Sequence, residues 1–217
     1  MPFLVFLTII NKEVNMKGQN FDFHKAIQAL FYIQSKSNIT DKLSLLKILF
    51  FADRYHIRNY GIPLLQDNYF AMKLGPVCSK TYDLIKKGLY YDGLNDADRI
   101  FIDSNLFCNN DIVSIKDTGM ENLSESDFEA LNFSVDTFSK FTPYELSDIT
   151  HEYPEWKKFK DLFDNQISTS ENMNYCDFFD NPSENSPIIK KFFNGKDPFY
   201  DDELFLKAMK QEYYSSI

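Results

Sequence analysis

Three residues of this 217-residue chain could perform acid–base chemistry if folding brought them together. Asp53 and His56 stand three positions apart, which makes them neighbours on one side of a helix. His151 comes from a distant part of the chain. Because an aspartate can orient a histidine as a general base, these residues suggest a hydrolase as one hypothesis.

The other parts of such a site are not recognisable in the sequence. No serine or cysteine lies in a nucleophile-type turn, and no glycine-rich phosphate loop is present. The simpler interpretation of Asp53 is a buried carboxylate paired with His56, Lys73 or backbone donors. In that case His56 and His151 satisfy hydrogen bonds and keep helices in register. We favour this structural interpretation over catalysis.

Metal binding is also disfavoured by spacing. The histidines and cysteines match no zinc pattern, which leaves a composite site of Asp53, His56 and His151 as a less favoured alternative. We therefore predict no metal and no cofactor. The three cysteines are far apart and odd in number, which is typical of a reduced, cytoplasmic protein. They are Cys78, Cys108 and Cys176.

Apolar residues cover most of the circumference of the helix predicted over residues 43–59. Such a helix needs other elements on most of its sides, so we expect it at the centre of the domain. Lys47, Arg54 and Arg58 fall together on the narrow remaining side, and we interpret them as a solvated basic stripe. Gly61 is expected to end the helix as a left-handed cap.

Short strands are predicted between the helices. Residues 69–74 form one strand, which a Gly-Pro pair stops before a helix over residues 77–87. Residues 106–108 and 112–115 form a hairpin that could join the first strand in one sheet. Residues 164–174 are expected to be a mobile loop. The fold class is therefore mainly α (α+β), a helical domain around a buried central helix with a small antiparallel β-sheet.

Two groups of motifs follow one another along the chain. A helix ending in FADRYHIRNYG is followed, after a polar gap, by YFAMKLGPVCSKTYDLI. A later helix ends in Thr150 and His151, with Trp156 five residues on. Together these motifs resemble the Panacea domain, the SocA-like antitoxin family of bacterial toxin–antitoxin systems and phage-associated proteins. The resemblance covers residues 21–163, although the gap at 64–68 lacks the Thr-Gly turn often seen in the family.

The resemblance implies a division of the chain and a structural motif. We expect an N-terminal extension over residues 1–15, with Met16 as the favoured native start, the Panacea/SocA-like domain over 16–163, and a C-terminal loop and helix over 164–217. The implied structural residues are Asp53, His56, Tyr60, Gly61, Lys73, Gly75, Pro76, Tyr82, His151 and Trp156.

The resemblance also implies an antitoxin that neutralises a cognate protein toxin by direct binding. Two alternatives remain, a proteolytic adaptor that delivers the toxin to a protease and the hydrolase described above. The partner surface is expected outside the shared motifs, in residues 90–99 and 175–200. Its candidate anchors are the aromatic residues of these segments, Tyr90, Tyr91, Phe178, Phe179, Phe199 and Tyr200.

The charge of the chain supports a protein partner over other classes. Its net charge is −9 and its pI is about 4.8. Neutralising phosphates needs clustered cations, so this composition disfavours nucleic-acid binding. The apolar stretch over residues 1–10 is too short to span a bilayer, so no membrane association is predicted.

Overall fold

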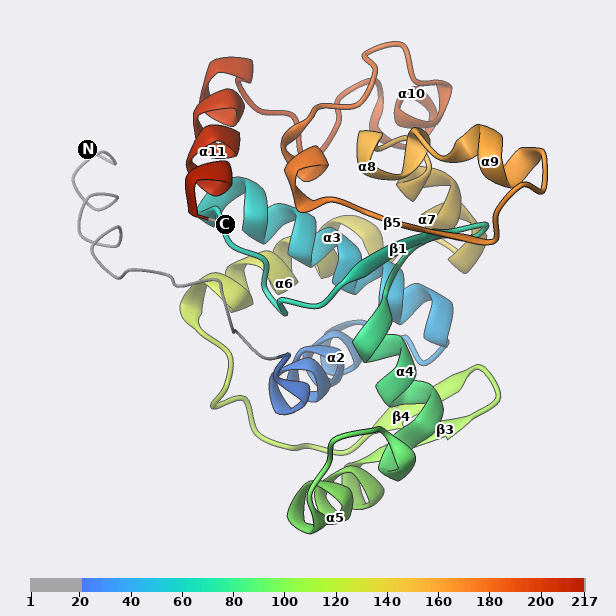
Figure 1. Cartoon of the computed structure of the whole chain (residues 1–217), viewed down its shortest axis with the longest axis vertical. Helices are drawn as coiled ribbons and strands as arrows, with labels where there is room; N and C mark the ends of the chain where they lie inside the picture. Colours follow the sequence, from blue (N-terminus) through green and yellow to red (C-terminus); the bar gives the residue numbers. More distant parts are fainter. Residues whose placement is uncertain (1–20, 217) are drawn as a thin grey trace.

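A single helix, α3 (Lys42–Tyr60), runs through the middle of the molecule (Figure 1). The computed structural model describes residues 21–216, and the extension predicted over residues 1–15 lies outside them. The Asp41 side chain accepts a hydrogen bond from the Ser44 amide and begins α3. Gly61, at φ +72°, ends it as the predicted left-handed cap. The predicted buried central helix is confirmed.

Helices surround α3 on several sides. α2 (Phe23–Ser37), α6 (Glu125–Phe138) and α7 (Pro143–Thr150) pack against it. α6 and α7 both begin with a capping box, in which a side chain and a backbone amide satisfy each other at the helix start. The remaining helical elements are α4 (Ser79–Lys87), η1 (Gly88–Tyr90), α5 (Asp96–Asn105), α8 (Pro154–Lys157), α9 (Lys160–Asp164), η2 (Tyr175–Phe179), α10 (Pro187–Phe193) and α11 (Glu203–Ser216).

Within residues 21–216 the strands form two separate antiparallel sheets, not the one sheet that the sequence suggested. β1 (Tyr69–Met72) lies between β2 (Gly75–Cys78) and β5 (Ser170–Asn172). β3 (Leu106–Asn109) pairs only with β4 (Ile112–Ile115), which confirms the predicted hairpin. The Gly-Pro pair therefore opens a strand instead of stopping one.

The segment predicted to be a mobile loop over residues 164–174 contains β5. Its backbone pairs with β1, with Phe70 opposite Asn172 and Met72 opposite Ser170. A strand of three polar residues carries no hydrophobic periodicity, so its pairing could not be recognised locally. The interpretation as a loop was wrong for this reason.

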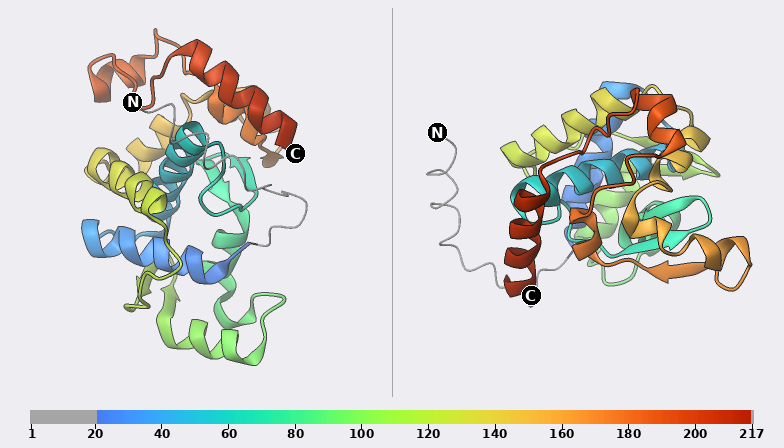
Figure 2. Two further views of the ribbon diagram at one scale, coloured as in Figure 1. Left: turned by 90° about the vertical axis from the view of Figure 1, so that its left-hand side faces the viewer. Right: turned by 90° about the horizontal axis from the view of Figure 1, so that it is seen from above.

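The core is rich in aromatic rings contributed by distant parts of the chain. Phe138 of α6 stacks on Phe51 of α3, with ring centroids 3.8 Å apart, and on Phe199, at 5.6 Å. Figure 2 shows α11 across the end of the molecule that lies opposite α5. Mainly helical structure with small antiparallel sheets confirms the predicted fold class.

Candidate functional site

Asp53 lies wholly inside the protein and holds the chain reversal that follows α3. One carboxylate oxygen accepts a hydrogen bond from the Leu64 amide. Burial raises the pKa of Asp53 to about 7, since an apolar interior disfavours the charged form. Of the partners that the sequence suggested, a backbone donor is the one observed.

His56 connects the same reversal to the start of α6. Its Nδ1 lies 2.7 Å from the Ile62 carbonyl oxygen, and its Nε2 lies 3.1 Å from Ser126 Oγ. Asp127 Oδ1 is 3.5 Å from the same Nε2 and the other Asp127 oxygen pairs with Lys25. Burial lowers the pKa of His56, and the contacts of its two ring nitrogens link the reversal to α6.

His151 stacks face to face on Trp156, with ring centroids 3.6 Å apart. Trp156 Nε1 donates to the Met72 carbonyl, which joins α8 to the end of β1. Burial lowers the pKa of His151 to about 4, and the positive charge of Lys47 adds to this shift.

The three residues of the hydrolase hypothesis are not joined to one another. Within residues 21–216, no hydrogen bond or ion pair links Asp53, His56 and His151, because each contacts a different neighbour. The same described residues contain no group of three or more His, Cys, Asp or Glu side chains that could hold a metal ion. The hydrolase remains a prediction without a direct contact to support it.

Gly75 sits where no larger residue fits. Its φ is +95°, and an added Cβ would collide with Thr150 Oγ1 and lie 2.9 Å from Lys47 Nζ. Lys47 donates to the carbonyl oxygen of Pro76 at 2.6 Å. Lys47 is fully buried, and burial lowers its pKa to about 7. The start of β2 is thereby fixed against α3 and α7.

The remaining motif residues lie nearer the surface. Tyr60 donates to Glu129 of α6 at 2.7 Å. Tyr82 is half-buried, with the ammonium of Lys42 5.8 Å from its ring centroid. Lys73 is exposed in the turn between β1 and β2. The motif thus consists mainly of residues that join α3, its following reversal and the β1–β2 hairpin.

The basic residues of α3 correct the sequence interpretation. Lys47, Arg54 and Arg58 were expected as a solvated stripe, yet each is at most 2% exposed. Arg54 pairs with the buried carboxylate of Glu155 and donates to the Asp180 carbonyl. Its guanidinium also lies 4.3 Å from the Tyr153 ring centroid. The C-terminal part of the chain covers this side of α3, which no local pattern could reveal.

Among the described residues, the side-chain hydrogen bonds of Arg58 all go to that C-terminal part. Its guanidinium donates to the carbonyl oxygens of Phe178 (2.9 Å), Asp180 (3.2 Å) and Phe199 (2.8 Å), and to Asn181 Oδ1 (2.6 Å). Burial lowers the pKa of Arg58 to about 9, and the charge of Arg54 contributes. Arg58, together with the contact from Arg54 to the Asp180 carbonyl, therefore holds residues 178–199 on α3.

The aromatic residues predicted as partner anchors divide into two groups. Phe178, Phe179 and Phe199 belong to the core, each at most 5% exposed, so their prediction as surface anchors was wrong. The reason is the coverage of α3 just described. Tyr90 is 76% exposed and Tyr200 is 61% exposed. Tyr91 is half-buried beside Phe21.

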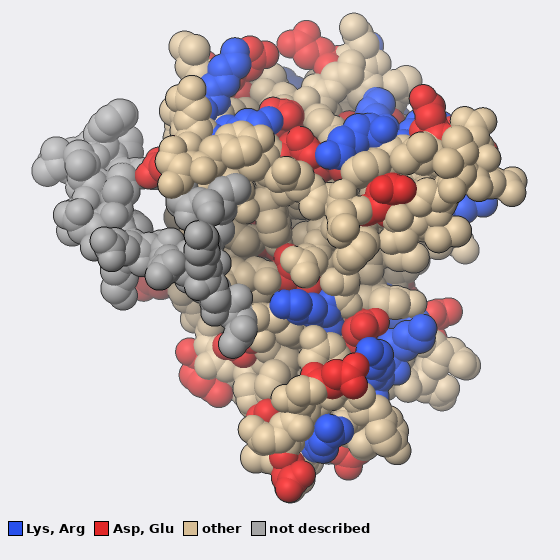
Figure 3. Space-filling view, viewed as in Figure 1, with Lys and Arg blue, Asp and Glu red and all other residues tan. Residues whose placement is uncertain are grey.

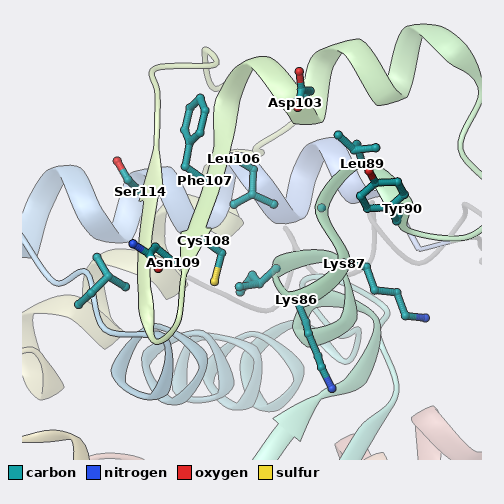
Figure 4. A pocket seen from close by; sticks show the side chains of 13 residues that line it. Lys86, Lys87, Leu89, Tyr90, Asp103, Leu106, Phe107, Cys108, Asn109 and Ser114 are labelled. Carbon is teal, nitrogen blue, oxygen red and sulfur yellow. The ribbon is translucent and has the colours of Figure 1, made fainter.

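Tyr90 ends η1, which contacts α5, and Tyr200 lies in the connection between α10 and α11. α5 and α10 lie at opposite ends of the molecule (Figure 1). At the α5 end, further apolar side chains are exposed, namely Ile100, Phe107 and Ile112. Sequence reasoning missed them, although alternation in the predicted hairpin puts Phe107 and Ile112 on one face. Here Tyr90 and Phe107 line a cavity of about 490 Å³ between α4, η1 and β3 (Figure 4).

Charge is distributed without a continuous basic surface on the face shown in Figure 3, where acidic and basic side chains are interspersed. Among the described residues, no helix is both long enough and apolar enough to cross a membrane. These observations leave exposed apolar and aromatic groups as the main candidate contact features.

Comparison with protein families gives a match. The family model described as "Antitoxin SocA-like, Panacea domain" matches residues 45–157, which is more than half of the chain. No curated protein and no solved structure matches the sequence. The matched residues contain α3 from residue 45 onward, its reversal, both hairpins and the His151–Trp156 stack described above. The chain therefore belongs to the SocA-like antitoxin family with a Panacea domain.

Proposed function

We propose that this protein is an antitoxin that neutralises a cognate protein toxin by binding it directly. Membership of the SocA-like family supports an antitoxin role. The acidic net charge of −9 favours encounter with a basic protein, because opposite fields accelerate association. The three free thiols support action in a reducing compartment such as the cytoplasm.

One observation carries this proposal: the family motif is built into the interior. Asp53, His56, Gly75 and Trp156 bind the backbone or side chains of this chain, and all four are buried. A motif of this kind supplies a scaffold, and a scaffold acts through its surface. Neutralisation would then follow from occlusion of the toxin by exposed residues.

The experiment begins with the genes that neighbour this one. Each open reading frame is expressed alone and together with this protein, and the toxic product that this protein rescues is identified. Purified toxin and antitoxin are then mixed, and we expect a stable complex by calorimetry. Rescue without any measurable complex would contradict direct neutralisation.

Two controls separate the alternatives. The half-life of the toxin in cells should be the same with and without this protein, whereas a proteolytic adaptor would shorten it. Folded Asp53→Asn and His151→Ala variants should still rescue growth. Loss of rescue in both variants, with complex formation intact, would instead favour a hydrolase.

A further inference from the structure

The outer edge of β4 is closed by hydrogen bonds from α2 and the loop that follows it. The Val113 amide donates to the Thr40 carbonyl at 2.7 Å. Gln34 Nε2 donates to the Val113 carbonyl at 2.6 Å, and the Ile115 amide donates to Gln34 Oε1 at 3.0 Å. The Gln34 side chain thus satisfies two backbone groups of β4 that would otherwise be free to pair with another strand.

The outer edge of β3 is open. Cys108 lies opposite Val113, and the Val113 amide and carbonyl both point away from β3. In an antiparallel pair such residues form the non-hydrogen-bonded type, so the amide and carbonyl of Cys108 also point outward. Neither group has a hydrogen-bond partner among residues 21–216, nor does the Leu106 carbonyl.

The cavity of about 490 Å³ runs beside this open edge (Figure 4). Leu106 and Cys108 of β3 form one side, and the opposite side comes from the end of α4 and η1, including Ile85, Lys86, Leu89 and Tyr90. Cys108, Lys86 and Tyr90 are exposed, so solvent reaches the edge. Unpaired backbone groups and apolar side chains therefore face the same space.

We propose that this cavity binds an extended segment of the partner protein, which adds as a third strand to the outer edge of β3. The inference rests on the proposed function and names the part of the surface that contacts the toxin. The Cys108 amide and carbonyl and the Leu106 carbonyl supply the backbone hydrogen bonds. Alternate side chains of the segment pack toward Ile85 and Leu89, and an acidic residue suits the ammonium of Lys86.

The outer edge of β3 is suited to bind an extended backbone. Outward amide and carbonyl groups on one strand match the alternating donors and acceptors of another strand, which a helix cannot offer. The outer edge of β5 differs, because it bears only the polar residues Ser170, Glu171 and Asn172. The cavity of about 570 Å³ beside Tyr200 is lined by loop and helix residues and no strand.

The test uses a matched pair of variants at Cys108 in the full chain. Cys108→Pro removes the outward amide but no hydrogen bond to β4, whereas Cys108→Val keeps the amide. With the toxin identified by rescue, we expect Cys108→Pro to weaken binding at least about tenfold and Cys108→Val to change it less than about twofold. Exchange of the wild-type Cys108 amide should slow when toxin binds, while the Val113 amide stays protected in both states.

The following results would overturn the proposal. If wild type binds the toxin but Cys108→Pro binds equally well and the Cys108 amide exchanges at an unchanged rate, the edge is not the docking site and the antitoxin role stands. If Cys108→Pro does not fold, amide exchange in the wild type decides alone. If the Cys108 amide already exchanges slowly in the free protein, another segment occupies the edge of β3. That segment is residues 1–20 if their deletion makes exchange fast, or a second copy of the chain if dilution makes it fast. Absence of any toxin binding by wild type rejects the proposed function itself.

Discussion

Two aromatic-rich regions of this molecule have opposite roles despite similar composition. Residues 175–200 and the end formed by α4, α5 and β3 both contain clustered aromatic residues. In the first region Phe178, Phe179 and Phe199 enter the core, and in the second Tyr90 and Phe107 remain exposed. The two regions lie at opposite ends of the long axis (Figures 1 and 2).

The difference originates on α3, which is far in sequence from residues 175–200. Arg54 and Arg58 donate to backbone carbonyls of residues 178–199, so the chain is fixed with its aromatic rings inward. At the α5 end, Arg99 donates to the Leu89 carbonyl and fixes η1 from outside the core. Aromatic composition alone therefore does not identify a partner surface, because buried cations such as Arg54 and Arg58 decide which aromatic rings turn inward.

The largest effect is expected from Arg58→Ala. The variant leaves the Phe178 and Phe199 carbonyls unpaired inside the protein, and should lower the free energy of unfolding by about 3–5 kcal/mol. Chemical denaturation measures this change, and limited proteolysis should cut residues 175–200 first.

Lys207→Ala is the matched control, because Lys207 is an exposed cation on α11 whose nearest acidic partner is 4.0 Å away. It should leave unfolding nearly unchanged. Equal stability of Arg58→Ala and Lys207→Ala would show that the C-terminal segment is not held by α3.

A smaller effect is expected from Gly75→Ala. An added Cβ at φ +95° meets Thr150 and Lys47, so we expect a loss of about 2–3 kcal/mol in the free energy of unfolding. Gly93, at φ +84°, has open space around its Cα, so Gly93→Ala should cost only about 1 kcal/mol. Thermal and denaturant unfolding of both variants separates the cost of backbone strain from the cost of the Cβ collision. Equal losses of stability in the two variants would contradict the close packing around Gly75.

Lys47 is expected to make the free energy of unfolding depend on pH. Its pKa is about 7 in the folded protein and 10.5 when exposed, so between these values the unfolded chain binds more protons. Stability due to this group should therefore rise with pH from about 7 to about 10.5, by at most about 1.4 kcal/mol per pH unit. The free energy of unfolding of wild type minus that of Lys47→Met, from denaturant titrations, should rise across this pH range. Parallel curves would show that Lys47 is solvated in the folded state.

Local sequence patterns predicted the central parts of this fold well. The apolar circumference of residues 43–59 required burial, and Gly61 marked the end of α3 as a left-handed cap. The turn at Asn110 between two β-rich runs marked the hairpin. Helix α5 was missed even though Asn95 and Asp98 form a capping box like those of α6 and α7.

Contacts between distant residues could not be predicted in this way. The partners of Arg58 lie 120 to 141 positions further along the chain, and helical periodicity cannot distinguish a covered basic stripe from a solvated one. The open edge of β3 likewise depends on Gln34 closing the other edge of the hairpin. For the candidate site, the aromatic residue types could be identified from the sequence, and only tertiary contacts separated exposed residues from buried ones.

The smallest effect on stability and the sharpest test of the comparison come from the exposed tyrosines. Tyr90→Ala and Tyr200→Ala should each change the free energy of unfolding by less than about 0.5 kcal/mol, because both rings are mainly in solvent. If the toxin binds at the α5 end, Tyr90→Ala should weaken the complex by about tenfold or more, since aromatic anchors dominate interfaces. Tyr200→Ala is then the matched control with unchanged affinity by calorimetry. The reverse result would move the partner surface to the α10 end, where it would adjoin the segment held by Arg58. Toxin binding would in that case stabilise this segment against proteolysis, which the α5-end surface would not do.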